Sequence, residues 1–191
     1  MKREVVRKAI HFLGLLYIPS YIFLGRNITL AAVVALTALS ALIEALRLFG
    51  KLCIPSLLLR DHERNRPAAY LYFGIAMSVV TAIFPEDACF SAIVCGIVGD
   101  GVAGIAKRAE SLRKLSHLLM FAISFLALYL LTLKPFPSAV ATVVAVVAER
   151  YPRIGKIYVD DNLSIPLLSS LSFWLFSSIS LLVVQIYLDI S

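Results

Sequence analysis

An aspartate inside an apolar, glycine-rich segment is the residue of this chain best placed to do chemistry. Asp100 occurs in CGIVGDGVAGIAKR, so Lys107 follows it about 10 Å further along a helix. A charge exposed to lipid costs about 2.5–3.5 kcal/mol, so a carboxylate at this depth favours a metal or phosphate site. The structural alternative is a close helix crossing, which the neighbouring glycines allow, with Asp100 paired to an arginine.

A second polar group, Asp160-Asp161-Asn162, precedes the last apolar segment. Two carboxylates and an amide supply the oxygen ligands that Mg²⁺ prefers, with phosphates as its further partners. The same residues suit a helix N-cap, where Asp and Asn are favoured and the helix dipole stabilises negative charge. The two interpretations are compatible, and both stay open.

Further charged residues lie near the ends of apolar segments. Arg7, Lys8 and His11 share one helical face by their spacing. Glu44 ends an apolar segment one turn before Arg47. As an alternative, these residues are plain anchors on the cytosolic side or parts of a solvated loop. The remaining candidates lie in a charged loop and beside two later segments: Arg60, Glu63, Lys107, Arg108, Lys114 and Glu149.

The elements that must position these groups are membrane helices. The chain has 191 residues, of which 60% are hydrophobic and 16% charged, and a mean hydropathy of +0.89; soluble domains carry about 25% charged residues. Because about 20 apolar residues cross a bilayer, the sequence predicts an all-α, polytopic bundle of about seven transmembrane helices in one domain, residues 1–191. The segments are Ala9–Gly25, Asn27–Ile43, Pro67–Pro85, Ala88–Ala106, Leu115–Leu133, the short Pro135–Ala148, and Asn162–Leu188.

The basic residues fall on alternate connections between these segments. Sixteen lie at the N-terminus or on the same side as it, and only Arg26 and Lys134 lie in the opposite connections. Because positive residues stay cytosolic, we expect a multi-pass protein of the cell membrane with a cytosolic N-terminus. Orientation accounts for the net charge of +6, so no nucleic-acid partner is expected. The three cysteines form no CxxC motif and give no basis for a disulfide or zinc site.

This orientation places all the polar groups at the cytosolic face. Carboxylates, an amide and many basic side chains there form a plausible site for a nucleoside triphosphate with Mg²⁺. The apolar body gives a lipid access to the same face. From composition and spacing, we therefore expect a protein that binds both a nucleotide and a lipid at this face.

The order and spacing of several short motifs resemble those of the membrane family that includes dolichol kinase, phytol kinase and CTP-dependent diacylglycerol kinase. The resemblance covers about residues 4–170. The matching pieces are Glu4-x-x-Arg7-Lys8-x-x-His11, Glu44-x-x-Arg47, Arg60-x-x-Glu63 before Ala69-Tyr70, Gly99-Asp100-x-x-Ala103, Ala148-Glu149 and Asp161-Asn162-Leu163-x-Ile165-Pro166.

The resemblance implies transfer of the γ-phosphate of CTP to the hydroxyl of a membrane alcohol, with Mg²⁺ as cofactor. Asp100 would bind the metal or accept the proton, and Asp161 and Asn162 would contact metal and nucleotide. Glu44, Glu63 and Glu149 would support the site. The phosphates would meet Lys107, Arg108 and Lys114, and the same face would be lined by Arg7, Lys8, His11, Arg47 and Arg60.

Two other functions remain open from the sequence. A phosphatidate cytidylyltransferase-like enzyme would also use CTP, but would release pyrophosphate and leave CMP on the lipid. A non-enzymatic transporter or channel would place Asp100 in a water-filled path and often has internal repeats. The sequence fixes neither the lipid alcohol nor the oligomeric state.

Overall fold

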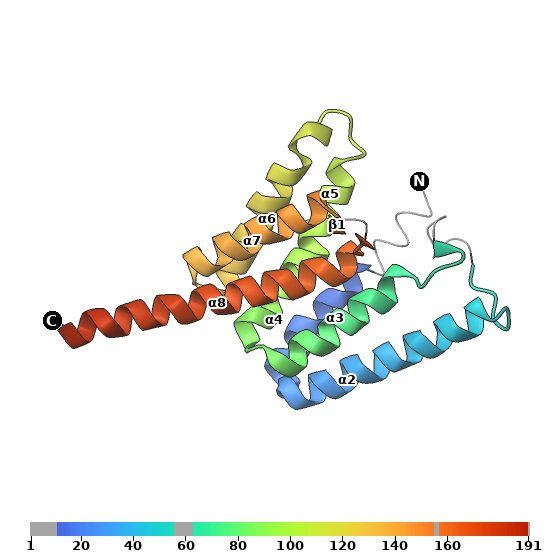
Figure 1. Ribbon diagram of the computed structural model, residues 1–191, viewed down its shortest axis with the longest axis horizontal. Helices are drawn as coiled ribbons and strands as arrows, with labels where there is room; N and C mark the ends of the chain where they lie inside the picture. The colour runs from blue at the N-terminus through green and yellow to red at the C-terminus, as the bar shows by residue number, and fades with distance from the viewer. Residues whose placement is uncertain (1–10, 56–62, 155–156, 191) are drawn as a thin grey trace.

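The computed structural model describes residues 11–55, 63–154 and 157–190 and is a bundle of helices (Figure 1). Two strands of two residues each pair antiparallel, with Ile154 opposite Ile157; apart from this small hairpin, the all-helical class predicted from the sequence is confirmed. The elements are η1 (Leu13–Leu16), α2 (Tyr17–Leu48), α3 (Ala69–Ile83), α4 (Glu86–Ile93), the π-helical η3 (Val94–Gly99), α5 (Asp100–Ala106), η4 (Arg113–Leu115), α6 (Ser116–Thr132), α7 (Pro135–Arg150), β1 (Arg153–Ile154), β2 (Ile157–Tyr158) and α8 (Asp161–Ile190).

Four helical segments in the described ranges are long and apolar enough to cross a membrane. α3 and α7 are apolar but have only 15 and 16 residues, against the roughly 20 that a span needs. The number of seven crossings therefore stays a prediction, and so does the side on which the N-terminus lies. The four segments are Leu13–Leu48, Glu86–Ala106, Arg113–Thr132 and Asp161–Leu182.

The outer surface of the bundle carries large apolar side chains. Phe23, Leu133 and Leu181 are 82%, 72% and 67% exposed, and many other leucines and isoleucines are more than half exposed. Soluble monomers rarely expose apolar patches of more than a few hundred Å². Together with the four long apolar helices, this exterior is that of a membrane helix bundle.

A break at Gly25 divides the segment Leu13–Leu48 into a shorter and a longer helix. Gly25 has φ +77° and ψ 170°, a conformation that glycine adopts without the steric cost met by other residues. Beside it, Arg26 donates from Nε to Thr81 O at 2.9 Å and from Nη2 to Ala82 O at 2.6 Å. These carbonyls belong to the last turn of α3 and have no partner within the helix, so Arg26 holds the break against the end of α3.

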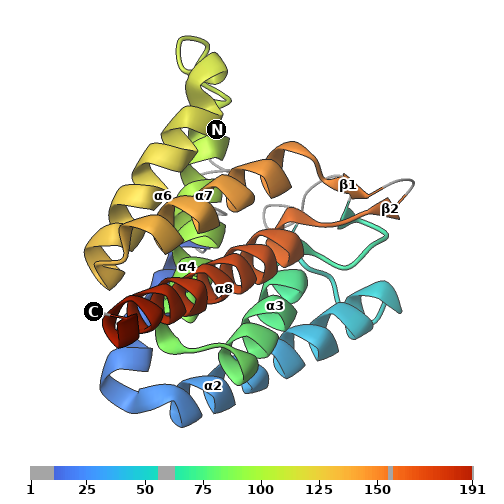
Figure 2. The same cartoon turned by 60° about the vertical axis from the view of Figure 1, so that its left-hand side comes forward.

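The helix α4–η3–α5 runs through the middle of the bundle (Figure 2). In its most apolar stretch 72% of the residues are buried, against 11–33% in the other three long segments. Its middle contains the π-helical turn Val94–Gly99, a widening that often occurs at functional sites. Asp100 follows directly after this turn, on the most enclosed of the four long apolar segments.

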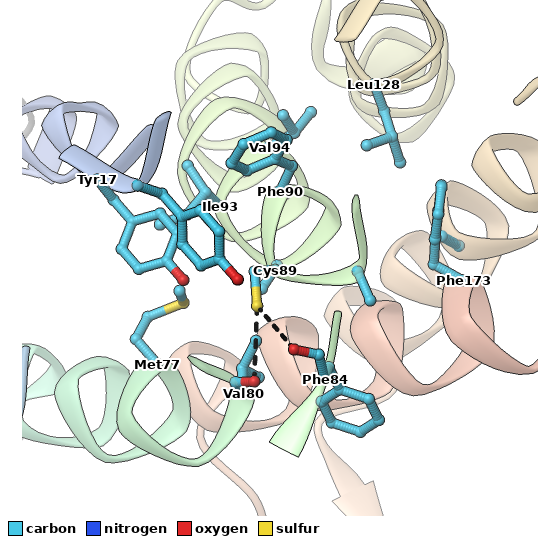
Figure 3. Packing of buried hydrophobic residues seen from close by; sticks show 14 of the residues in the cluster. Tyr17, Met77, Val80, Phe84, Cys89, Phe90, Ile93, Val94, Leu128 and Phe173 are labelled. Carbon is cyan, nitrogen blue, oxygen red and sulfur yellow. Dashed lines mark hydrogen bonds between the residues drawn. The ribbon is translucent and has the colours of Figure 1, made fainter. Parts of the chain in front are cut away.

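Figure 3 shows the apolar centre around the first half of this helix. Phe90 and Ile93 are buried there against Tyr17 of α2. The thiol of Cys89 points at the last turn of α3, 3.6 Å from Val80 O. Cys89 is a free, buried thiol, as is Cys95 further along the same helix.

The polar ends of the helices gather on one side of the bundle. α2, α5 and α7 end there, and α3, α6 and α8 begin there, to the right and at the top of Figure 1 and opposite the C-terminal end of α8. The described candidate residues on these helices lie within about two turns of those ends. The fold therefore brings residues that are far apart in sequence to a common side.

Candidate functional site

Glycines on the central helix let two other segments approach the backbone on either side of Asp100. A Cβ built on Gly96 would lie 3.1 Å from Cγ of Pro166 in α8, and one built on Gly101 would lie 3.0 Å from Cζ of Phe12. At these distances Pro166 or Phe12 would have to shift by a few tenths of an ångström to admit even a methyl group, so the two glycines allow a close approach. The close crossing expected as the structural alternative is present, and it covers the helix around Asp100.

The partner of Asp100 is a histidine. His11 Nε2 lies 3.9 Å from Asp100 Oδ2 and 3.2 Å from Gly96 O, and the two side chains are 22% and 23% exposed. Neither an arginine nor Lys107, the cations considered from the sequence, is the described partner of this carboxylate. A carboxylate beside a partly buried imidazole is an arrangement that can accept a proton from a nearby hydroxyl.

Two carboxylates converge on one amide at the start of α8. Asn162 Nδ2 donates to Asp160 Oδ1 at 2.9 Å and to Asp161 Oδ1 at 2.7 Å. The backbone N–H of Asn162 donates to the same two oxygens at 3.0 and 2.9 Å. Asp160 thus caps the helix, as the N-cap interpretation predicts, while the cluster still concentrates hard oxygen donors and negative charge at one point.

The packing of α8 on the central helix relates this cluster to Asp100. The two helices run in opposite directions (Figure 1), and they touch where Gly96 meets Pro166. Asp100 lies one turn after Gly96, and Asn162 lies one turn before Pro166. Because the two helices run in opposite directions, both residues lie on the same side of the Gly96–Pro166 contact. Asp100 and Asn162 therefore occupy corresponding turns of neighbouring helices.

A third cluster centres on Glu149, whose side chain is 6% exposed near the end of α7. Lys107, after α5, donates to its Oε1. His117, on the first turn of α6, places Nε2 at 2.9 Å from Oε2, an ion-pair distance without the alignment of a hydrogen bond. Glu149 thereby joins three helix ends at the side where Asp100 lies.

A fourth cluster ties the end of α2 to the start of α3. The carboxylate of Glu44, 2% exposed, receives Arg47 Nε at 3.1 Å and Nη2 at 2.5 Å, and also the hydroxyl of Tyr70. The guanidinium of Arg47 also donates to the carbonyls of Arg64 and Arg66 at 2.9 and 2.6 Å. These contacts tie Arg64–Arg66, just before α3, to the end of α2, and they use four of the five N–H donors of Arg47.

The described candidates therefore fall into distinct groups. His11 and Asp100 lie together, as do Asp161 and Asn162, and Lys107 and Glu149. Glu44 and Arg47 form the α2–α3 cluster, and buried Glu63 joins that region by accepting from Ala69 N at 3.2 Å. Arg108 and Lys114 are exposed after α5. Arg7, Lys8 and Arg60 lie outside the described residues.

The residues at the start of α8 suit Mg²⁺ by their donor chemistry. In residues 11–55, 63–154 and 157–190, no three His, Cys, Asp or Glu side chains come together as a metal-binding group. Mg²⁺, however, is usually held by one or two carboxylates, with waters and substrate phosphates as its other ligands. Asp160 and Asp161 supply that number, and Asp100 lies on the adjoining turn.

The sequence does not indicate the partners of two further residues, Tyr70 and His117. Tyr70 begins an apolar helix, where aromatic residues are common at the membrane interface, yet its hydroxyl binds buried Glu44. The sequence suggests that His117 is an ordinary buried histidine, but the packing of α6 against α7 places it beside Glu149. Both contacts depend on helix packing, which the sequence pattern does not specify.

Comparison with protein-family models, with curated proteins and with solved structures gives no match to this chain. The resemblance to lipid-alcohol kinases therefore remains an expectation from short motifs, and functional arguments depend on the arrangement of the residues.

Proposed function

We propose that this chain is a CTP-dependent kinase that phosphorylates the hydroxyl of a membrane lipid alcohol of the polyprenol, dolichol, phytol or diacylglycerol class. The observation that carries the proposal is the pairing of two polar clusters across one helix contact. One cluster is Asp100 with His11, and the other is Asn162 with Asp160 and Asp161. The two clusters lie on corresponding turns beside the Gly96–Pro166 crossing. One cluster suits a hydroxyl, and the other suits a metal-bound phosphate chain.

Phosphoryl transfer asks for positioning and charge neutralisation more than for covalent chemistry. In the proposed reaction the hydroxyl oxygen attacks the γ-phosphorus of CTP, the bond to the β-phosphate oxygen breaks, and CDP leaves. Asp100, which lies beside His11, takes the hydroxyl proton. Asp160, Asp161 and Asn162 would hold Mg²⁺, which supplies neutralisation of the phosphate charge when bound.

The basic residues have two roles in this proposal. Lys107 is positioned by Glu149 two turns beyond Asp100, and we assign it to the phosphates. Arg108, Lys114, Arg7, Lys8 and Arg60 remain candidates for the nucleotide by charge alone. Glu44 and two backbone carbonyls take four of the five N–H donors of Arg47, which supports a positioning role for this arginine.

The membrane placement is part of the proposal. We infer seven crossings with a cytosolic N-terminus, the break at Gly25 separating the first from the second. The two basic residues in the opposite connections have local partners that account for their positions: Arg26 binds the end of α3, and Lys134 Nζ lies 2.6 Å from Asp87 Oδ2. The orientation therefore follows from the basic residues on the other side.

The decisive assay uses purified protein in detergent with Mg²⁺, a membrane lipid extract and CTP labelled on the γ-phosphate. We expect label in a phosphorylated lipid and unlabelled CDP as coproduct. A second reaction with CTP labelled in the cytosine distinguishes the alternatives, because a cytidylyltransferase would transfer that label to lipid and release pyrophosphate. Lack of both labels in lipid, for prenols and diacylglycerol alike, would favour a transporter or channel over either enzyme.

A further inference from the structure

The connection between α5 and α6 forms a charged and apolar tip, residues 107–115. It projects beyond the ends of the neighbouring helices at the top of Figures 1 and 2. Its backbone is ordered by hydrogen bonds from Leu112 N to Ala109 O and from Leu115 N to Leu112 O, each 2.9 Å. The backbone of the tip therefore has a defined path from α5 to α6.

Two cations on this tip lack the partners that other basic residues of the site have. Arg47 is bound by Glu44, and Lys107 by Glu149. Arg113 and Lys114 are exposed, and neither side chain has a hydrogen bond or ion pair with any residue of the described ranges. Their charge is thus available to a partner outside the chain.

Leucines surround these two cations and are also exposed. Leu112, Leu115 and Leu118 are 41%, 47% and 61% exposed. Cations beside exposed apolar side chains are the pattern of a segment that lies at the boundary of headgroups and acyl chains, where both kinds of side chain are stabilised. Binding of a free nucleotide at the tip would explain the two cations, but the exposed leucines beside them would remain in water.

We propose that the tip binds anionic phospholipid headgroups through Arg113 and Lys114, with Leu112 and Leu115 in the interfacial layer. Basic residues near an anionic leaflet attract its headgroups at short range. The inference depends on the membrane placement given under the proposed function, but not on the kinase chemistry. It identifies a lipid partner other than the substrate and assigns Lys114, a candidate for the nucleotide by its charge, to that lipid instead.

The test uses full-length protein in bilayer nanodiscs with a fluorophore on Leu112→Cys in a Cys53→Ser background, because Cys89 and Cys95 are fully buried and unreactive. Quenching by brominated phosphatidylglycerol is compared with quenching by brominated phosphatidylcholine of the same chains. We expect a preference for the anionic lipid of about fivefold or more, which falls with high salt and is lost in the variant Arg113→Gln/Lys114→Gln.

The matched control places the same fluorophore on Leu133→Cys, at the other end of α6, beside Lys134 that is already paired with Asp87. It should be quenched by both lipids equally. Equal quenching at position 112 as well would refute the tip contact while leaving the membrane placement intact. Absence of quenching at both positions would refute the placement itself. Displacement of the anionic lipid by CTP would reassign the two cations to the nucleotide.

Discussion

Gly96 on the central helix lies against Pro166 of α8 so closely that a Cβ on the glycine would be 3.1 Å from the proline Cγ. The proline ring is rigid, and its helix is fixed by further contacts with the centre: the hydroxyl of Ser170 donates to Ala88 O at 2.9 Å. The contact therefore sets the distance between two helices. Because Asp100 and Asn162 lie one turn away on each helix, it also sets the separation of the two polar clusters.

Replacing Gly96 by valine should push these helices apart. Besides Pro166, the new side chain would meet Phe73, whose Cε2 lies 3.2 Å from the built Cβ. Overpacking of this kind costs about 1–3 kcal/mol, so we expect a lower unfolding temperature in detergent and weaker turnover in the remaining folded protein. Ala122→Val, on the exposed face of α6, is the control and should change neither. A Gly96→Val protein with wild-type stability and turnover would contradict the role given to this contact.

The sequence predicts the helical segments better than their packing. The break at Gly25 falls between two predicted spans, and α7 reaches Arg150, so the short sixth segment continues through Glu149. Both features follow from local signals: a glycine beside a charged residue, and an apolar run that ends in charge. The hairpin of β1 and β2 and the π-helical turn before Asp100 were not predicted, since two-residue strands and single π turns leave little pattern in a sequence.

The partners of the charged residues were less predictable. The glutamate and arginine at positions 44 and 47 pair as their spacing on one helix predicts. The partner of Asp100 is His11, 89 positions earlier in the chain, and Lys107 binds Glu149. Such pairings depend on which helices lie side by side, and alternation of apolar and charged segments does not determine that.

Glu149→Gln should loosen the junction of α5, α6 and α7. The amide keeps the shape of the side chain but gives up the charge that pairs with Lys107 and lies against His117. We expect a loss of stability of about 1–3 kcal/mol and faster amide hydrogen exchange across residues 107–117. Lys134→Gln is the control, since it breaks a pair whose side chains are 43% and 32% exposed, and such pairs contribute about 0–1 kcal/mol. Equal effects of the two variants would show that Glu149 is not a junction.

Tyr70→Phe tests the cluster at the end of α2 with a minimal change. The variant removes only the hydroxyl that binds Glu44, and loss of one hydrogen bond to a charged group costs about 1.5–3 kcal/mol. Tyr72→Phe, on the same helix but outside this cluster, is the matched control. Differential scanning fluorimetry in detergent measures both. An unchanged midpoint for Tyr70→Phe would mean that Arg47 and the backbone N–H of Ala68, which donates to Glu44 Oε2 at 3.1 Å, satisfy this carboxylate by themselves.

Single cysteines test the proposed crossings of α6. In a Cys53→Ser background, Glu110→Cys lies on the exposed tip before α6, and Leu133→Cys lies just after this helix. An impermeant maleimide added to sealed, right-side-out vesicles should label position 133 at once, and position 110 only after the membrane is opened. The Cys53→Ser parent, whose other two cysteines are buried, gives the background. Labelling of both positions from one side would contradict the proposed crossing of the membrane by α6.

Asp100→Asn separates chemistry from packing at the central helix. The amide has nearly the shape of the carboxylate and is easier to place in an apolar segment, so the variant should insert and fold as well as the wild type. It can neither accept the hydroxyl proton nor neutralise a cation, and we expect the kinase turnover to fall by about 100-fold or more at saturating CTP and Mg²⁺. Asp161→Asn should fall similarly, because it removes one carboxylate from the pair around Asn162.

The matched control for this prediction is Asp87→Asn, at the other end of the same central helix and paired with Lys134. It changes the same chemical group on the same helix, yet lies far from the Gly96–Pro166 crossing, and should keep nearly normal turnover. Rates are compared per amount of folded protein, measured by size-exclusion chromatography. If Asp100→Asn kept the turnover of the Asp87→Asn control, the carboxylate beside His11 would have to be a packing element, and the proton acceptor would lie elsewhere.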